Sequence, residues 1–304
     1  MKKIISIALA ACLAVTALAV AGCSEIESGN KIERMVMTLE FYDANNNVVD
    51  TKNVQIKLYT NYAPETTKAF KKLCESGFYD GTCIYNVQSN WLEFGKFSYD
   101  NDGKLVETEA YKNAEAIKGE FSKNGWVGNR LTTQKAALIM KRDYDNGTDK
   151  KYDTAKGAVI VAMNSVSTFP SDKYCVFGMI CDDDEKLNPS VKSENSDLVN
   201  RSGLTSYAVI ATVKDLRQTE DLTMTYYYDP ATVSENAKFV SGLYTKTVDE
   251  VGITHYYRGT EVNEQNVMSD EDASDFATLL ADQANFFYTV PYTRVLVKKI
   301  VKKA

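Results

Sequence analysis

Alternating hydrophobic and polar residues mark the first folded part of the chain as β-sheet. The segments Met35–Phe41 and Val54–Leu58 both alternate with a period of two. Residues 43–47 between them are rich in Asn and Asp, which suit a tight turn. The pattern predicts a β-hairpin with one buried face and one exposed face.

A helix is predicted directly after this hairpin. Pro64 stands at its first position, where a missing backbone N–H costs nothing, and Gly77 stands just after its end. Thr66, Phe70 and Leu73 fall on one apolar stripe between them. Short strand-like runs then recur at 84–87, 137–140, 158–162 and 174–180. Many short strands and few helices predict a mainly β, closed antiparallel barrel.

The second half of the chain has a different pattern. The apolar run Tyr207–Val213 fits a strand or a helix beside the core, and residues 216–268 are rich in Thr and Tyr. Cross-strand packing in a sheet explains these tyrosines better than sugar stacking. Ser269 is a predicted N-cap for a helix to about Phe287, whose apolar stripe we expect against the barrel. A last strand is predicted at Val295–Ile300.

The first 22 residues have the pattern of an export signal. Lys2 and Lys3 precede the apolar run Ile4–Ala21. The segment Val20–Cys23 resembles a bacterial lipobox, which implies that Cys23 is lipidated, becomes the mature N-terminus and anchors the chain in the lipid bilayer, facing outside the cytoplasm. The apolar run also approaches the length of an uncleaved membrane anchor. We interpret residues 1–22 as a lipoprotein signal peptide and 23–33 as a lipidated tether.

Charge and composition exclude several function classes. The chain has 35 Lys+Arg against 41 Asp+Glu, so it lacks the basic surface of a nucleic-acid binder. Its single histidine, His255, excludes a zinc site that needs two histidines. The acidic run Asp182–Glu185 lacks the alternating ligands and glycine of an EF-hand. No nucleotide-binding glycine motif occurs, and we expect no metal and no cofactor.

Four cysteines remain if Cys23 is lipidated: Cys74, Cys83, Cys175 and Cys181. Export permits disulfides, and four cysteines allow three pairings that the sequence does not distinguish. Cys74 lies in the predicted helix and Cys175 in a strand-like run, which favours buried free thiols.

Several motifs, in the right order, resemble those of cyclophilins. They are Val54–Tyr59, Ala63–Thr66, Gly77–Thr82, Ile117–Gly125 and Lys173–Gly178. The resemblance implies a closed eight-stranded antiparallel barrel capped by helices, with peptidyl-prolyl cis-trans isomerase activity. It assigns residues 34–183 to the barrel and 289–304 to its closing strand, with residues 184–288 as an α+β insertion before that strand.

The resemblance also implies which positions form the site. Asn86 stands where the family has the arginine that hydrogen-bonds the prolyl nitrogen. Trp91 and Leu92 keep the apolar character of the proline pocket. An Arg-to-Asn exchange replaces a charged donor of about 1.5–3 kcal/mol with a neutral one of about 0.5–1.5 kcal/mol. We therefore predict activity about one to two orders of magnitude lower than with the arginine.

Five further positions complete the predicted substrate pocket. Phe94 and Ala158 replace polar contacts to the substrate backbone, and Ile160 replaces a pocket phenylalanine. Phe169 and Tyr174 fall near a pocket-wall aromatic and a family histidine.

Two functions follow from this reading of the residues. The first is a membrane-tethered isomerase that acts, weakly, on proline-containing segments of exported proteins. The donor is then either Asn86, as a weak neutral donor, or a basic residue that substitutes for the family arginine. Arg142 is the nearest by motif, although the family arginine in that motif is not the catalytic one. The second is a non-catalytic peptide- or protein-binding module on the cell surface. A solute-binding lipoprotein is disfavoured because the barrel leaves no room for two α/β lobes. We expect a monomer.

Overall fold

The computed structural model describes residues 32–101, 103–143, 150–164, 166–181, 205–217, 222–230, 238–282 and 287–303. The predicted signal peptide, Cys23 and the acidic run 182–185 lie outside these residues. No helix within the described ranges is both long enough and apolar enough to cross a membrane.

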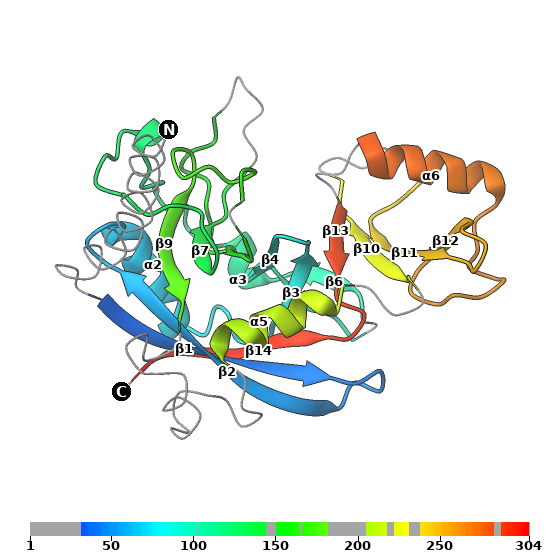
Figure 1. Ribbon diagram of the computed structural model, residues 1–304, viewed down its shortest axis with the longest axis horizontal. Helices are drawn as coiled ribbons and strands as arrows, with labels where there is room; N and C mark the ends of the chain where they lie inside the picture. Colours follow the sequence, from blue (N-terminus) through cyan, green and yellow to red (C-terminus); the bar gives the residue numbers. More distant parts are fainter. Residues whose placement is uncertain are drawn as a thin grey trace, which may run out of the picture.

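Eight strands form the larger part of the molecule (Figure 1). They are β1 (Ile32–Tyr42), β2 (Val48–Tyr59), β3 (Thr82–Val87), β4 (Trp91–Phe94), β7 (Ala137–Met140), β8 (Val159–Ala162), β9 (Cys175–Ile180) and β14 (Val295–Lys302). They close into an antiparallel barrel in the order β1-β14-β3-β4-β8-β7-β9-β2. The prediction of a mainly β, closed eight-stranded antiparallel barrel is confirmed.

The period-two pattern separates the inside of the barrel from its outside. Met37 and Leu39 of β1 and Val54 and Ile56 of β2 are fully or almost fully buried in one interior cluster. Burial of each such side chain stabilises the fold by about 1.5–3 kcal/mol. The hairpin predicted from this pattern is β1–β2, which pairs along its whole length.

Helix α2 (Pro64–Glu75) packs on the barrel. Its Phe70 ring lies 5.3 Å from Tyr79 and 5.1 Å from Phe177. The residue before the helix gives no side-chain cap, and the buried Glu120 carboxylate takes that role. It accepts the N–H of Glu65 at 3.0 Å and the N–H of Thr66 at 2.7 Å. A negative charge is favourable at a helix N-terminus, so Glu120 fixes the segment around it to α2.

Helix α5 (Ser206–Asp215) packs against β2, and its buried side chains belong to the interior cluster of the barrel. It contains the apolar run for which the sequence left strand and helix open. Val209, Ile210 and Val213 are fully buried. Ser206 Oγ accepts the backbone N–H of Gln55 at 2.9 Å, which joins the helix to the barrel.

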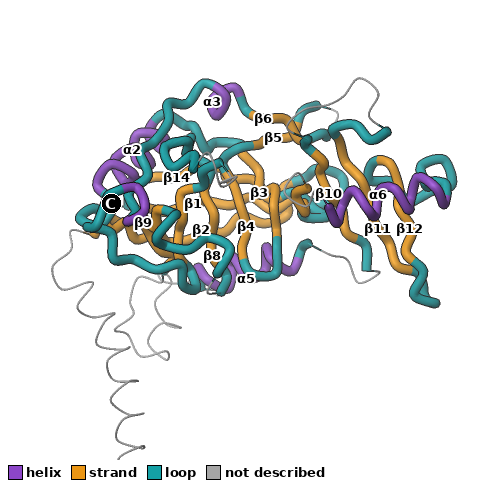
Figure 2. The backbone as a smooth tube through the Cα atoms, turned by 90° about the horizontal axis from the view of Figure 1, so that it is seen from above, coloured by secondary structure: helices purple, strands orange, loops and turns teal. Residues whose placement is uncertain are grey.

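A second, smaller sheet lies beside the barrel (Figures 1 and 2). It contains β10 (Met224–Tyr228), β11 (Gly242–Val248), β12 (Thr254–Arg258) and β13 (Phe287–Val290) in the order β12-β11-β10-β13. The tyrosines of β10 pair across this sheet, for example Tyr226 with Tyr244. The strand β13 runs across the boundary that we placed between residues 288 and 289.

Helix α6 (Asp270–Asp282) covers one face of the small sheet. The predicted N-cap is present, because Ser269 Oγ accepts the N–H of Asp272 at 3.2 Å. Two expectations were wrong. The helix ends before Phe287, which lies in β13, and the apolar side of α6 faces the sheet rather than the barrel. The apolar side of α6 faces the small sheet because the Phe276 ring packs among Phe239, Tyr244 and Phe287.

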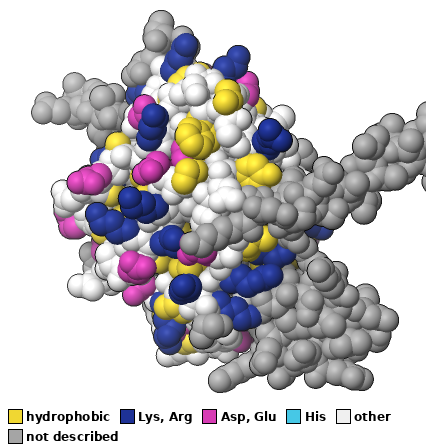
Figure 3. Space-filling view, turned by 90° about the vertical axis from the view of Figure 1, so that its left-hand side faces the viewer, with side chains coloured by type: hydrophobic (Ala, Val, Ile, Leu, Met, Phe, Trp, Pro, Cys, Tyr) yellow, Lys and Arg dark blue, Asp and Glu magenta, His cyan; other side chains and the backbone are white. Residues whose placement is uncertain are grey.

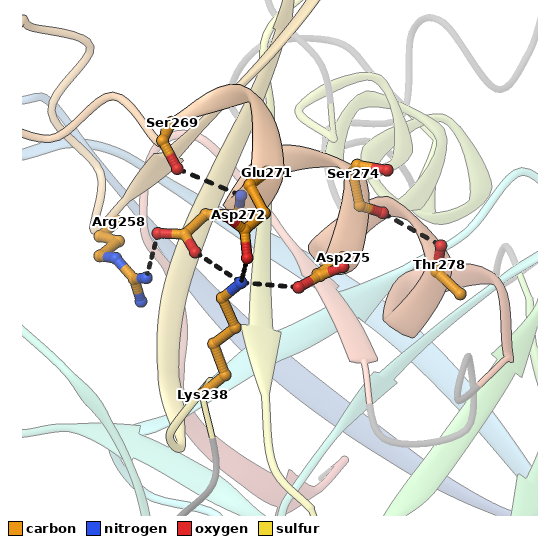
Figure 4. Close-up of polar contacts among 8 residues, drawn as sticks. All are labelled: Lys238, Arg258, Ser269, Glu271, Asp272, Ser274, Asp275 and Thr278. Atoms are coloured by element: carbon orange, nitrogen blue, oxygen red, sulfur yellow. Dashed lines mark hydrogen bonds and ion pairs between the residues drawn. The ribbon is translucent and has the colours of Figure 1, made fainter.

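Lys238 fastens the chain before β11 to α6 (Figure 4). Its Nζ lies 2.6 Å from Asp275, 2.9 Å from Asp272 and 3.4 Å from Glu271. Asp272 also accepts a hydrogen bond from Arg258 at 3.1 Å. The hydrogen bond from Lys238 is the main reason why the pKa of Asp272 is lowered.

An aromatic junction joins the small sheet to the barrel. It includes Tyr85 of β3, Phe97 of the short strand β5 (Phe97–Tyr99), and Tyr227 and Tyr288 of the small sheet. Strand β5 pairs with β6 (Leu105–Glu107). The Tyr288 ring lies 5.5 Å from both Tyr85 and Phe97. The small sheet therefore stands against the outer side of β3.

The four cysteines of the described chain are buried free thiols, as predicted. Burial raises the pKa of each of Cys74, Cys83 and Cys175, the last to about 12.

Candidate functional site

A row of facing residues crosses the outer side of the barrel. Asn86 of β3 pairs with Glu93 of β4, and Glu93 pairs with Ile160 of β8. Ile160 in turn pairs with Ile139 of β7. Because paired residues in a sheet project to the same side, this row brings the predicted Asn86 and Ile160 onto one face.

Glu93 is the centre of a polar network on this face. Its side chain is only 3% exposed. Its Oε1 accepts hydrogen bonds from Asn86 Nδ2 at 2.8 Å and from Trp91 Nε1 at 3.3 Å. Its Oε2 forms an ion pair with Lys141 Nζ. A buried carboxylate is costly unless it is paired, and these three partners provide the compensation.

Asn86 is held by both the barrel and the small sheet. It is 7% exposed. Its Oδ1 accepts from Gln88 Nε2 at 2.8 Å and from the backbone N–H of Thr289 at 3.3 Å. Gln88 also donates to Thr289 Oγ1 at 3.1 Å. Both polar atoms of the Asn86 amide therefore form hydrogen bonds. Strand β13 covers this position, which the resemblance assigned to the catalytic donor.

Lys141 brings a positive charge into this network. Its side chain is 22% exposed. Its Nζ lies 5.5 Å from the ring centre of Tyr85 and 5.2 Å from that of Tyr288. Aromatic faces attract cations, so the two rings and Glu93 hold the ammonium group from three sides.

Lys96 also lies against the aromatic junction. Its Nζ lies 4.5 Å from the ring centre of Phe97 and 5.6 Å from that of Tyr288. Asp229 lies 3.7 Å away. Burial lowers the pKa of Lys96.

Arg142 has a structural place outside the network. Its Nε donates to the carbonyl of Lys173 at 2.9 Å, and its Nη1 donates to the carbonyls of Asp143 at 2.8 Å and Lys150 at 3.1 Å. The guanidinium also lies 4.3 Å from the ring centre of Tyr174. These contacts remove Arg142 as a replacement for the family arginine.

Four of the predicted pocket residues pack together beside Glu93 in what we call the aromatic slot. We use this name for Trp91, Ile160, Phe169 and Tyr174, which share one cluster outside the barrel. The Trp91 and Phe169 rings meet edge to face at 5.2 Å, and Phe169 meets Tyr174 at 5.2 Å. Trp91 and Phe169 are half-buried, so solvent reaches the slot.

Leu92 and Phe94 lie on the opposite side of the sheet, which corrects their predicted place in the pocket. Both are fully buried in the interior cluster, where Phe94 packs 5.7 Å from Tyr79. Successive residues of a strand point to opposite faces, so Leu92 and Trp91 do not share a slot. Ala158 is also fully buried, and its carbonyl accepts the N–H of Lys141 at 2.9 Å.

We did not predict Glu93 and Lys141 as site residues from the sequence. Glu93 is a carboxylate inside the otherwise apolar strand Trp91–Phe94, and this was the available signal. Lys141 carries no such signal, because its approach to Glu93 depends on the order of strands in the barrel.

The described chain also has a cavity away from the aromatic slot. A cavity of about 530 Å³ lies between α2 and residues 115–118, with Leu73 and Ile117 among its lining residues, and none of the slot residues line it. The face shown in Figure 3 carries basic, acidic and hydrophobic side chains interspersed. The described residues contain no cluster of three side chains that fits a metal ion.

Comparison with known proteins places this arrangement in a family. Among solved structures, a cyclophilin type peptidyl-prolyl cis-trans isomerase of Cryptosporidium parvum is similar at 11% identity and a TM-score of 0.43, with 90% of this chain and 99% of that chain covered. A second structure of such a protein from that organism, in the presence of the dipeptide Ala-Pro, has 16% identity and a TM-score of 0.31, with 54% and 91% covered. No curated protein matches the sequence. The family described as cyclophilin type peptidyl-prolyl cis-trans isomerase/CLD matches residues 45–205, more than half of the sequence, and the chain therefore belongs to this family.

Proposed function

We propose that this protein is a membrane-tethered prolyl isomerase of weakened activity, which acts outside the cytoplasm on X-Pro bonds of exported polypeptides. Family membership supports the reaction. The export signal in residues 1–22 and the lipobox-like segment that ends at Cys23 support the location and the tether.

The observation that carries the proposed reaction is the aromatic slot next to a charged polar network. Rotation about an X-Pro bond has a barrier near ~18–20 kcal/mol, which comes from conjugation of the nitrogen lone pair. A catalyst lowers it by holding the ring in an apolar slot and donating a hydrogen bond to the nitrogen as it pyramidalises. Trp91 and Phe169 offer half-exposed rings for the first task. Trp91 also donates its indole N–H to Glu93, so the charged network directly adjoins the slot.

The weakened activity follows from Asn86. A neutral amide that already bonds Glu93, Gln88 and Thr289 is a poorer donor than a free guanidinium. A charged hydrogen bond contributes about 1.5–3 kcal/mol against about 0.5–1.5 kcal/mol for a neutral one.

A second candidate is a binding module without catalysis. The cover that β13 places on Asn86 favours it, because a slot can bind proline rings while the donor position stays closed.

The test is isomerisation of a tetrapeptide with a central Ala-Pro bond by the mature protein in detergent, together with binding of the same peptide. Rate enhancement that disappears in Trp91→Ala supports the isomerase. Binding without enhancement supports the binding module, and the absence of both contradicts the two proposals. Membrane association and acylation that are lost in Cys23→Ser test the tether.

A further inference from the structure

Lys141 stands where the aromatic slot meets the charged network. It follows β7 directly, and its backbone N–H binds the carbonyl of Ala158. Its Nζ is paired with Glu93, and the same carboxylate accepts the indole N–H of Trp91 at 3.3 Å. One carboxylate therefore positions both a cation and a wall of the slot.

The ammonium group of Lys141 keeps donor capacity in this position. An ammonium group has three N–H donors, and Glu93 accepts one of them. The rings of Tyr85 and Tyr288 flank the group at 5.5 and 5.2 Å and attract its charge through their faces. The Lys141 side chain is 22% exposed, so part of it is open to solvent.

The other cations of this region are placed differently. Arg142 is committed to three backbone carbonyls and to the Tyr174 ring. Lys96 lies over Phe97 and near Asp229. Within the described residues, Lys141 is the cation that forms an ion pair with Glu93.

We infer that Lys141 is the catalytic hydrogen-bond donor to the prolyl nitrogen, held in place by Glu93, and that Asn86 only anchors the network. The inference rests on the proposed isomerase function. As the bond twists, the nitrogen lone pair localises and accepts a hydrogen bond from the ammonium group. No covalent bond forms or breaks, and the proton stays on the lysine. A charged donor stabilises this twisted state more than the neutral Asn86 amide does, but the ion pair with Glu93 makes Lys141 a weaker donor than a free guanidinium, which agrees with the weakened activity proposed above.

The experiment measures kcat/KM for the Ala-Pro tetrapeptide and the affinity for the same peptide, with the mature protein in detergent. Lys141→Met is expected to lower kcat/KM at least tenfold while peptide affinity changes less than threefold. Lys141→Arg, which keeps a charged donor, is expected to retain activity within tenfold. Lys68→Met, at an exposed position of α2, is the matched control and should leave both quantities unchanged.

Lys141→Met leaves the Glu93 charge buried without its cation, so folding is checked by circular dichroism. If the single variant does not fold, the double variant Lys141→Met/Glu93→Gln removes both charges and gives the same test. Wild-type enhancement that either folded variant keeps overturns the role of Lys141 alone. Absence of enhancement in the wild type overturns the proposed isomerase function and the donor role together.

Discussion

Thr289 donates its backbone N–H to Asn86 at 3.3 Å although the two residues are 203 positions apart. The first belongs to the small sheet and the second to the barrel. The contact places part of the small sheet directly over the family's donor position, and it makes Asn86 a joint between the two sheets.

Restoring the family residue at this joint should damage the protein. Asn86→Arg adds volume at a buried position and removes the acceptor for Gln88 and Thr289. Overpacking of this kind costs about 1–3 kcal/mol. We expect urea unfolding to show that loss, with no gain in isomerase activity. The control Asn45→Arg lies in an exposed turn and should change the free energy of unfolding by less than about 0.5 kcal/mol. A stable, more active Asn86→Arg protein would contradict the role of Asn86 as a joint.

Substitution of Trp91 should weaken binding of the proline peptide, whereas substitution of Trp126 should not. Both tryptophans are half-buried, and Trp126 donates its indole N–H to the carbonyl of Tyr62 at 3.0 Å. An aromatic pair such as Trp91–Phe169 contributes about 0.5–1.5 kcal/mol beyond the burial of its area. We expect Trp91→Ala to lower affinity for the proline peptide about tenfold or more. Trp126→Ala should leave that affinity unchanged, and an equal loss in both variants would count against the slot.

Removal of the α2 cap should destabilise the barrel. Glu120 accepts two backbone N–H groups of α2, and hydrogen bonds to a charged group contribute about 1.5–3 kcal/mol. Glu120→Ala is therefore expected to lower the free energy of unfolding by about 2–3 kcal/mol in urea. The exposed Glu115→Ala is the matched control and should have little effect. A Glu120→Ala protein as stable as this control would show that the cap is dispensable.

The buried thiols should resist alkylation in the native state. Burial raises the pKa of Cys175 to about 12, so almost no reactive thiolate is present at pH 8. In a Cys12→Ser/Cys23→Ser background, we expect slow labelling of the native protein by maleimide and four labels in urea. Rapid labelling of a native thiol would show that at least one of the four sites opens readily.

The Lys238 network should weaken in acid. The hydrogen bond from Lys238 lowers the pKa of Asp272, so the folded state binds its proton less readily than the unfolded state. This contribution is fully present above the unfolded pKa and is lost as pH falls through the folded value. The stability difference between wild type and Lys238→Met should therefore shrink between about pH 5 and 2. A constant difference over that range would assign the effect of Lys238 to packing.

The sequence predicted the elements whose signal is local. The β1–β2 hairpin follows from alternation alone, and Pro64 begins α2 as expected. The site was only partly predictable. Trp91 and Phe169, which the resemblance assigned to the pocket, lie together in one cluster outside the barrel, whereas Leu92 points inward with the pleat of β4.

The missing parts of the site depend on long-range geometry. Lys141 reaches Glu93 because β8 alone separates β4 from β7 in the barrel. Thr289 reaches Asn86 because the aromatic junction docks the small sheet on β3. Neither approach leaves a trace in the local pattern of hydrophobic and polar residues, and Asn86 by itself looks like a simple loss of the family arginine.

The position of β14 between β1 and β3 has a consequence for how the chain folds. Lys298 of β14 and Glu40 of β1 form an ion pair at 2.6 Å across 258 positions. Until β14 has been synthesised, the facing edges of β1 and β3 have no partner, and an unpaired edge strand is a template for aggregation. Contacts of such long sequence separation also make folding slow. The barrel can therefore close only after β14, the last strand of the chain's described part, has been inserted between these two edges.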